Sequence, residues 1–82
     1  MKMEKQFVYV WISEYRNIEE KEFEVNVLGV FCDLKTAQNT LIQEVKVATQ
    51  DGWNTQIEST NAVIMTCGNS TQTYTIIRKE LE

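Results

Sequence analysis

Hydrophobic and polar residues alternate along several short stretches of the chain, which is the pattern of strands whose two faces differ. The first stretch, FVYVWI, is apolar at every position and predicts a strand over about Gln6–Ser13. Alternate side chains of a strand point to opposite faces. One face would carry three aromatic residues, Phe7, Tyr9 and Trp11. The other would carry three aliphatic residues, Val8, Val10 and Ile12.

A charged segment, EYRNIEEKE at residues 14–22, follows this strand and predicts a solvated hairpin loop. A second strand is expected over about Phe23–Cys32, because apolar and polar residues alternate at its start. After Val27 the run LGVF is apolar on both faces, so the late half of this strand should be buried on both sides. Within it, Gly29 indicates a bulge or a close backbone approach.

The clearest helix spans Leu34–Gln50. Its apolar residues recur at spacings of three and four, at Leu34, Ala37, Leu41, Val45 and Ala48. Asp33 is suited to cap the first turn, because its carboxylate accepts the free amide hydrogens there. Gly52 suits the left-handed residue that ends a helix, and Trp53 can then fold back on the last turn.

The rest of the chain alternates strand and turn signals. Trp53, Thr55 and Ile57 predict a short edge strand, followed by strands over Ala62–Cys67 and about Gln72–Lys79 and a hairpin loop at Gly68–Thr71. The 82 residues therefore predict one α+β domain, residues 1–82. We expect two layers: an antiparallel sheet of four or five strands with one helix packed on one face, in the order ββαββ or ββαβββ.

The predicted helix is about 25 Å long and can cover only one face of the sheet. Tyr and Trp each carry a polar hydrogen that suits a half-exposed position, so we place the aliphatic row under the helix and the aromatic row on the uncovered face. A large exposed apolar patch usually marks an interface. The predicted partner-binding residues are Phe7, Tyr9, Trp11, Tyr74 and Ile76. The expected partner is a protein, most simply a second copy in a homodimer, unless the acidic loop or the Trp53 segment folds over this face.

Charge narrows the classes of partner. The net charge is −4, and the eight Lys and Arg residues are scattered, so the chain lacks the basic stripe that nucleic-acid binding needs. No apolar run approaches the ~20 residues of a membrane helix, and the charged start followed by six apolar residues does not fit a secretory signal. We therefore expect a cytoplasmic protein that binds neither nucleic acid nor membrane.

The chain contains no histidine, which removes the usual general base near neutral pH and the commonest zinc ligand. Cys32 precedes the helix, where the dipole favours a thiolate, but the carboxylate of Asp33 disfavours it. We expect Cys32 and Cys67 to be free and buried. The three glycines are far apart and form no phosphate loop. The sequence therefore predicts a non-enzymatic protein with no catalytic residue, metal or cofactor.

The segment VLGVFCDLKTAQNTL resembles the strand-to-helix junction of small bacterial and phage proteins of unknown function. In those proteins a strand ends in Gly-Val-Phe, and a capping residue and a helical alanine follow. Here these are Gly29, Val30, Phe31, Asp33 and Ala37. The resemblance implies the strand-strand-helix-strand-strand order and no catalytic residue. It also suggests an alternative function, a small acidic inhibitor of a host factor encoded by a phage or mobile element.

Overall fold

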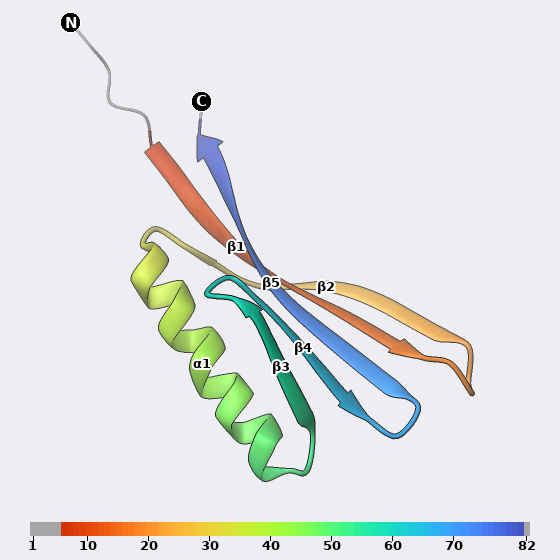
Figure 1. The fold of residues 1–82 in the computed structure, drawn as a ribbon. Coiled ribbons are helices and arrows are strands. Elements are labelled where there is room, and N and C mark those ends of the chain that lie inside the picture. Colours follow the sequence, from red (N-terminus) through yellow and green to blue (C-terminus); the bar gives the residue numbers. More distant parts are fainter. Residues whose placement is uncertain (1–5, 82) are drawn as a thin grey trace, which may run out of the picture.

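A computed structural model describes residues 6–81 of the chain. These residues form five antiparallel strands and one helix in the order ββαβββ (Figure 1). The elements are β1 Gln6–Asn17, β2 Glu22–Phe31, α1 Leu34–Gln50, β3 Asn54–Ser59, β4 Ala62–Cys67 and β5 Ser70–Leu81. The predicted α+β fold is confirmed, with the longer of the two expected orders.

The strands lie in the order β2-β1-β5-β4-β3, so the helix connects the two edges of the sheet. Five strands spaced ~4.8 Å apart are about 20 Å wide, and a helix of 17 residues is about 25 Å long. The helix is therefore long enough to pass from one edge to the other over a single face. It contacts β1, β2, β3 and β5 from that side (Figure 1).

Both ends of α1 lie where the sequence predicts them. The Asp33 carboxylate accepts hydrogen bonds from the Thr36 amide at 3.0 Å and the Thr36 hydroxyl at 2.9 Å. These bonds stabilise the ionised form and lower the pKa of Asp33. At the other end Gly52 has φ +94°, and the Trp53 amide donates to the Ala48 carbonyl at 3.0 Å. The backbone thus reverses as a glycine-terminated helix should.

The charged segment after β1 is mostly strand, so the prediction of a long loop over residues 14–22 is wrong. β1 pairs with β2 as far as Asn17 opposite Glu22, leaving a turn of residues 18–21 in which Lys21 has φ +57°. β1 also pairs with β5 over the same length. Backbone pairing on both sides holds Glu14–Asn17 extended, and charged side chains are compatible with a strand where it faces water.

The second hairpin is also tighter than expected. The loop joining β4 to β5 consists of Gly68 and Asn69 only, since Cys67 pairs directly with Ser70. Gly68 has φ +59°, which glycine adopts without strain. Ser70 and Thr71 belong to β5, and this strand runs beside β1 from one end to the other.

A bulge interrupts the pairing of β1 with β2. Trp11 pairs with Gly29 and Ile12 with Val27, so Leu28 is the extra residue. A Cβ atom at Gly29 would lie 2.9 Å from Cε2 of Phe31, closer than a normal contact. The expected bulge is therefore confirmed next to Gly29, while the group that approaches this glycine closely is the Phe31 ring and not another backbone segment.

The core lies between the helix and the aromatic side of the sheet. Its buried apolar residues are Trp11, Ala37, Leu41, Val63, Met65 and Ile76. The prediction that Val8, Val10 and Ile12 lie under the helix is therefore wrong, because Trp11 occupies that side with only 6% of its surface exposed. Ala37 of the helix is buried in the same core, and Gly29, opposite Trp11 on β2, leaves room for the Phe31 ring, which packs against that core.

Candidate protein-binding surface

We call the side of the sheet turned away from α1 the open face. Cross-strand partners share a face, so the register assigns its residues. The central strand β1 contributes Val8, Val10 and Ile12. The edge strand β2 contributes Phe23, Val25, Val27 and Val30. From the other side, β5 contributes Ile77 beside Val10, whereas Ile64 of β4 lies apart from this group, beside Thr73. Three neighbouring strands therefore present a continuous aliphatic surface.

These side chains are accessible in the single chain. Val27 and Val30 leave 62% and 61% of their surface exposed, and Phe23 leaves 57%. The three residues of β1 are half-buried, because strands flank them on both sides. Scattered exposed apolar residues are normal on a protein surface, but a contiguous group of this kind usually marks an interface.

The same strands carry polar side chains on their other side, beyond the hydrophobic core. Tyr15 and Ser70 share a hydrogen bond of 3.0 Å, and the Asn17 amide donates to the Ser70 hydroxyl at 3.2 Å. The Gln72 amide donates to the buried Ser13 hydroxyl. A sheet surface that meets water is expected to look like this. On the open face, β1 carries Val8, Val10 and Ile12 before the polar residues Glu14 and Arg16.

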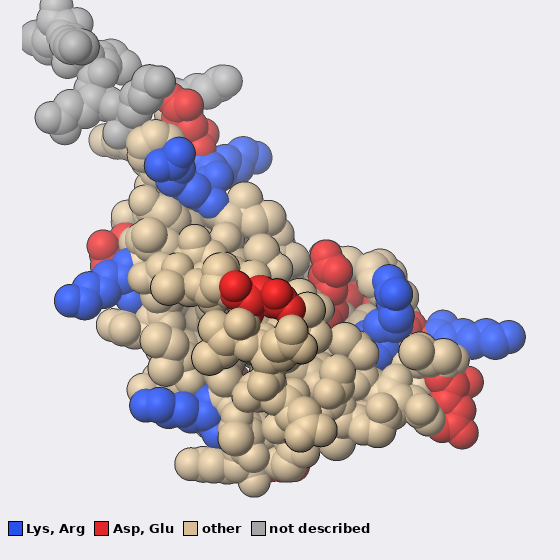
Figure 2. Space-filling view, in the orientation of Figure 1, with Lys and Arg blue, Asp and Glu red and all other residues tan. Residues whose placement is uncertain are grey.

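Charged residues on the open face lie at the two ends of the strands. Lys79 pairs with Val8 at one end, and Glu14 and Arg16 lie toward the β1–β2 hairpin at the other. The Arg16 guanidinium stacks over the Phe23 ring at 5.4 Å, toward the β2 edge. Figure 2, in which α1 and the β3 edge are nearer the viewer, shows charged side chains at the hairpin and near the opposite ends of β1 and β5. The middle of the open face is thus apolar and its ends are charged.

The five predicted partner-binding residues lie on the helix side, so their placement on the uncovered face is wrong. Trp11 and Ile76 are buried in the core, and Tyr9 and Tyr74 pack against it. Phe7 is half-buried beneath the Arg78 guanidinium, 4.5 Å from its ring centroid. The open-face residues were missed because strand parity alone does not say which row faces the helix. The pairing of Trp11 with Gly29 is the missing signal, and it requires the register.

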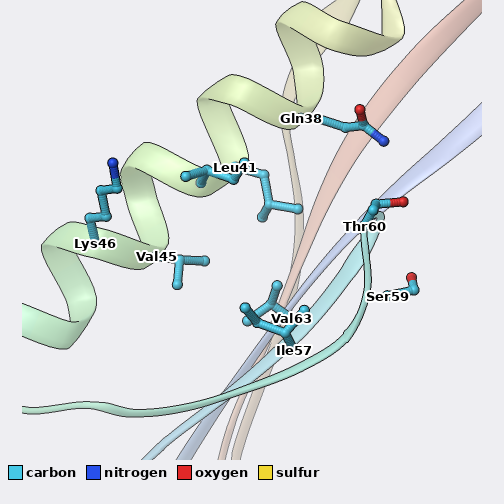
Figure 3. A pocket seen from close by; sticks show the side chains of 9 residues that line it. Gln38, Leu41, Val45, Lys46, Ile57, Ser59, Thr60 and Val63 are labelled. Atoms are coloured by element: carbon cyan, nitrogen blue, oxygen red, sulfur yellow. The ribbon is translucent and has the colours of Figure 1, made fainter.

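Apart from the open face, an apolar hollow lies between α1 and β3, with a volume of about 440 Å³ (Figure 3). Leu41 and Val63 are buried at its base, while Ile57 keeps 70% of its surface exposed. The Gln38 amide donates to the Asn61 side chain at 2.8 Å and ties the helix to the β3–β4 turn beside the hollow. The Lys46 side chain points away from it (Figure 3). The hollow is therefore a gap at the sheet edge without a charged group directed into it.

Groups that could support chemistry are sparse in the described residues. Cys32 and Cys67 are free but exposed, so the expectation that they are buried is wrong. Cys32 precedes the helix cap and Cys67 ends β4 beside a tight turn, where neither side chain reaches the core. Within residues 6–81 no group of three His, Cys, Asp or Glu residues is placed to hold a metal ion. Over the same residues, α1 lacks the length and apolar character of a membrane-spanning helix.

The chain was compared with known proteins at the level of families, sequences and structures. No family model, no curated protein and no solved structure matches it. The ββαβββ order has one strand more after the helix than the strand-strand-helix-strand-strand order that the resemblance to small bacterial and phage proteins implies.

Proposed function

We propose that this protein is a non-enzymatic interaction domain that binds a protein through the open face, and that the partner is a second copy of the chain. The described residues contain many exposed hydrophobic side chains, and the open face concentrates them on three adjacent strands. The partner-binding residues are then Val10, Ile12, Val27, Val30 and Ile77 instead of the aromatic row.

The contrast between the two sides of β1 supports this proposal most directly. On the helix side, the residues beyond the core are Ser13, Tyr15 and Asn17. On the open face the same strand carries only aliphatic residues from Val8 to Ile12. Beyond Ile12 the open face also becomes polar, at Glu14 and Arg16, so its aliphatic residues form a patch in the middle of the sheet. A surface of this composition is stabilised when it is removed from water, by roughly 25 cal/mol for each Å² of apolar area.

The size of the open face is sufficient for a stable dimer. The strands contain 6 to 12 residues each, and at ~4.8 Å spacing and ~3.3 Å per residue they give a sheet of roughly 700 Å². A standard protein interface buries about 800 Å² on each partner. Sheets stack face to face about 10 Å apart, so a dimer would have four layers with the helices outside. A two-fold interface brings the same patch of both copies together. The centre of the open face is aliphatic and uncharged, so two such patches can meet without repulsion.

The mass of the protein in solution tests the proposal. Light scattering after size-exclusion chromatography should give twice the chain mass of 9.6 kDa at micromolar concentration. Dilution should lower this mass toward one chain, with a midpoint at the dissociation constant. A mass of 9.6 kDa up to several hundred micromolar would rule out self-association.

The alternative, inhibition of a host factor, uses the same face. The net charge of −4 and the small size support it, and the exposed valines of β2 would then cover an apolar patch on another protein. The two proposals differ in the state of the isolated protein, because an inhibitor whose face awaits a different protein is a monomer alone. The mass measurement therefore distinguishes them.

A further inference from the structure

The polarity of the side chains on the open face changes across the sheet, from apolar at the β2 edge to polar at the β3 edge. β2 presents Val25, Val27 and Val30, whereas β3 presents Asn54 and Gln56. Two copies can stack so that β2 lies over β2 of the other copy or over its β3. The second arrangement buries valines against amides, which lose hydrogen bonds to water. The gradient therefore favours β2 over β2 and β1 over β1.

The charge of the open face also changes along the strands, from one end to the other. Lys79 lies at one end of β5, in register with Val8, and Glu14 lies six residues further along β1. At ~3.3 Å per residue the two charges are about 20 Å apart in one chain. Between them β1 and β5 present Val10, Ile12, Thr75 and Ile77. If the two copies stack with their strands running in the same direction, the same ends of the strands coincide. Lys79 of one copy then lies near Lys79 of the other. If they run in opposite directions about an axis at the level of Trp11, Lys79 lies over Thr73 of the other β5, one strand spacing (~4.8 Å) to the side of Glu14 and within reach of that carboxylate through its long side chain.

From these two gradients we infer the geometry of the dimer, an inference that rests on the proposed function. The two sheets stack with their strands antiparallel across the interface, and the two-fold axis lies across the strands between Val10 and Ile12. This face-to-face stacking places apolar strands over each other and brings Lys79 of one copy diagonally across from Glu14 of the other. Each dimer then holds two equivalent Lys79–Glu14 pairs, one at each end. Arg16 does not interfere, because it stacks on Phe23 toward the β2 edge.

Charge reversal tests the geometry. In Lys79→Glu two glutamates meet at each end of the dimer, and in Glu14→Lys two lysines meet. Each variant should dimerise at least about tenfold more weakly than the wild type, since two favourable pairs become repulsive. An equimolar mixture of the two variants should dimerise like the wild type, because each end of the mixed dimer again pairs opposite charges. The double variant K79E/E14K should also recover.

The controls separate this effect from a change in the fold or in net charge. Lys35→Glu and Glu44→Lys make the same charge changes on the exposed side of α1 and should leave the dimer unchanged. Circular dichroism should show the wild-type spectrum for every variant. At 1 M salt, where the Debye length is about 3 Å, both single variants should regain most of their association. Recovery in the mixture cannot arise within one chain, because the two positions lie about 20 Å apart.

The outcomes distinguish the geometry from the proposed function. If the wild type is a dimer and the mixture stays as weak as its components, or the single variants dimerise normally, the antiparallel geometry is wrong while the open-face dimer stands. If the wild type is a monomer at every concentration, both are wrong. A dimer that weakens in each single variant and returns in the mixture supports the geometry.

Discussion

Trp11 and Tyr74 meet edge to face beneath the helix, with ring centroids 5.3 Å apart and ring planes inclined at 76°. The two residues come from the neighbouring strands β1 and β5 and join the halves of the core. The indole nitrogen of Trp11 is buried and has no hydrogen-bond partner among the described residues. The contribution of the indole is therefore one of packing, and its contact with Tyr74 joins β1 and β5 within the core.

The first prediction follows from this burial. Trp11→Ala should lower the free energy of unfolding by about 3–5 kcal/mol, because it removes a large core side chain and leaves a cavity. That loss approaches the whole stability of a small domain. Ile57→Ala is the control, since 70% of its surface is already exposed, and it should change stability by less than about 0.5 kcal/mol. Urea unfolding followed by circular dichroism measures both. Equal effects would show that Trp11 is not part of the core.

The second prediction concerns the cap of α1. The Thr36 amide and hydroxyl hold the pKa of Asp33 below its ordinary value of 3.8. A carboxyl whose pKa is lowered by folding stabilises the protein above the unfolded pKa, and this stabilisation disappears as the pH falls through the folded pKa. Asp33→Ala should therefore melt at a lower temperature than the wild type at pH 7, and the difference should shrink below pH 3.8. Asp33→Asn keeps the capping bond and should retain most of the stability without that pH dependence.

The third prediction concerns the β1–β2 hairpin. A hydrogen bond with Glu20 and the repulsion between the two carboxylates raise the pKa of Glu22 above its ordinary value of 4.5, and Glu24 adds to the repulsion. A carboxyl whose pKa is raised by folding stabilises the fold below the unfolded pKa, and this contribution is lost as the pH rises through the folded pKa. In Glu20→Gln the NMR titration of the Glu22 carboxyl should move back toward 4.5. Glu58→Gln, on β3 at the far edge of the sheet, should leave that titration in place.

The helix and most of the strands were predictable because their signals are local. Asp33, Gly52 and the spacing of Leu41 and Val45 fix α1 without reference to the rest of the chain. The length of the β1–β2 hairpin was not predictable in this way. Charged residues such as Glu14 indicate a loop by composition, whereas backbone pairing with both β2 and β5 makes the segment a strand.

The sequence predicted an apolar sheet face that the helix does not cover. It assigned the aromatic row of β1 to this face, whereas the aliphatic row lies there. The sequence shows that both sides of β1 are apolar and that one helix covers only one side. Which row the helix covers depends on contacts between residues distant in sequence, above all Gly29 opposite Trp11. The polar hydrogen of tryptophan suggested an exposed position, but the packing of the whole indole outweighs one unpaired N–H group.

The most direct test of the open-face dimer is a matched pair of charge insertions measured by sedimentation equilibrium. Val27 and Ile57 are exposed to similar extents, 62% and 70%, but Val27 lies on the open face and Ile57 on the helix side of the β3 edge. Val27→Glu buries two unpaired carboxylates in the dimer and should raise the dissociation constant at least about a hundredfold. Ile57→Glu should leave it unchanged. A dimer that survives Val27→Glu and is lost in Ile57→Glu would contradict the open face as the interface.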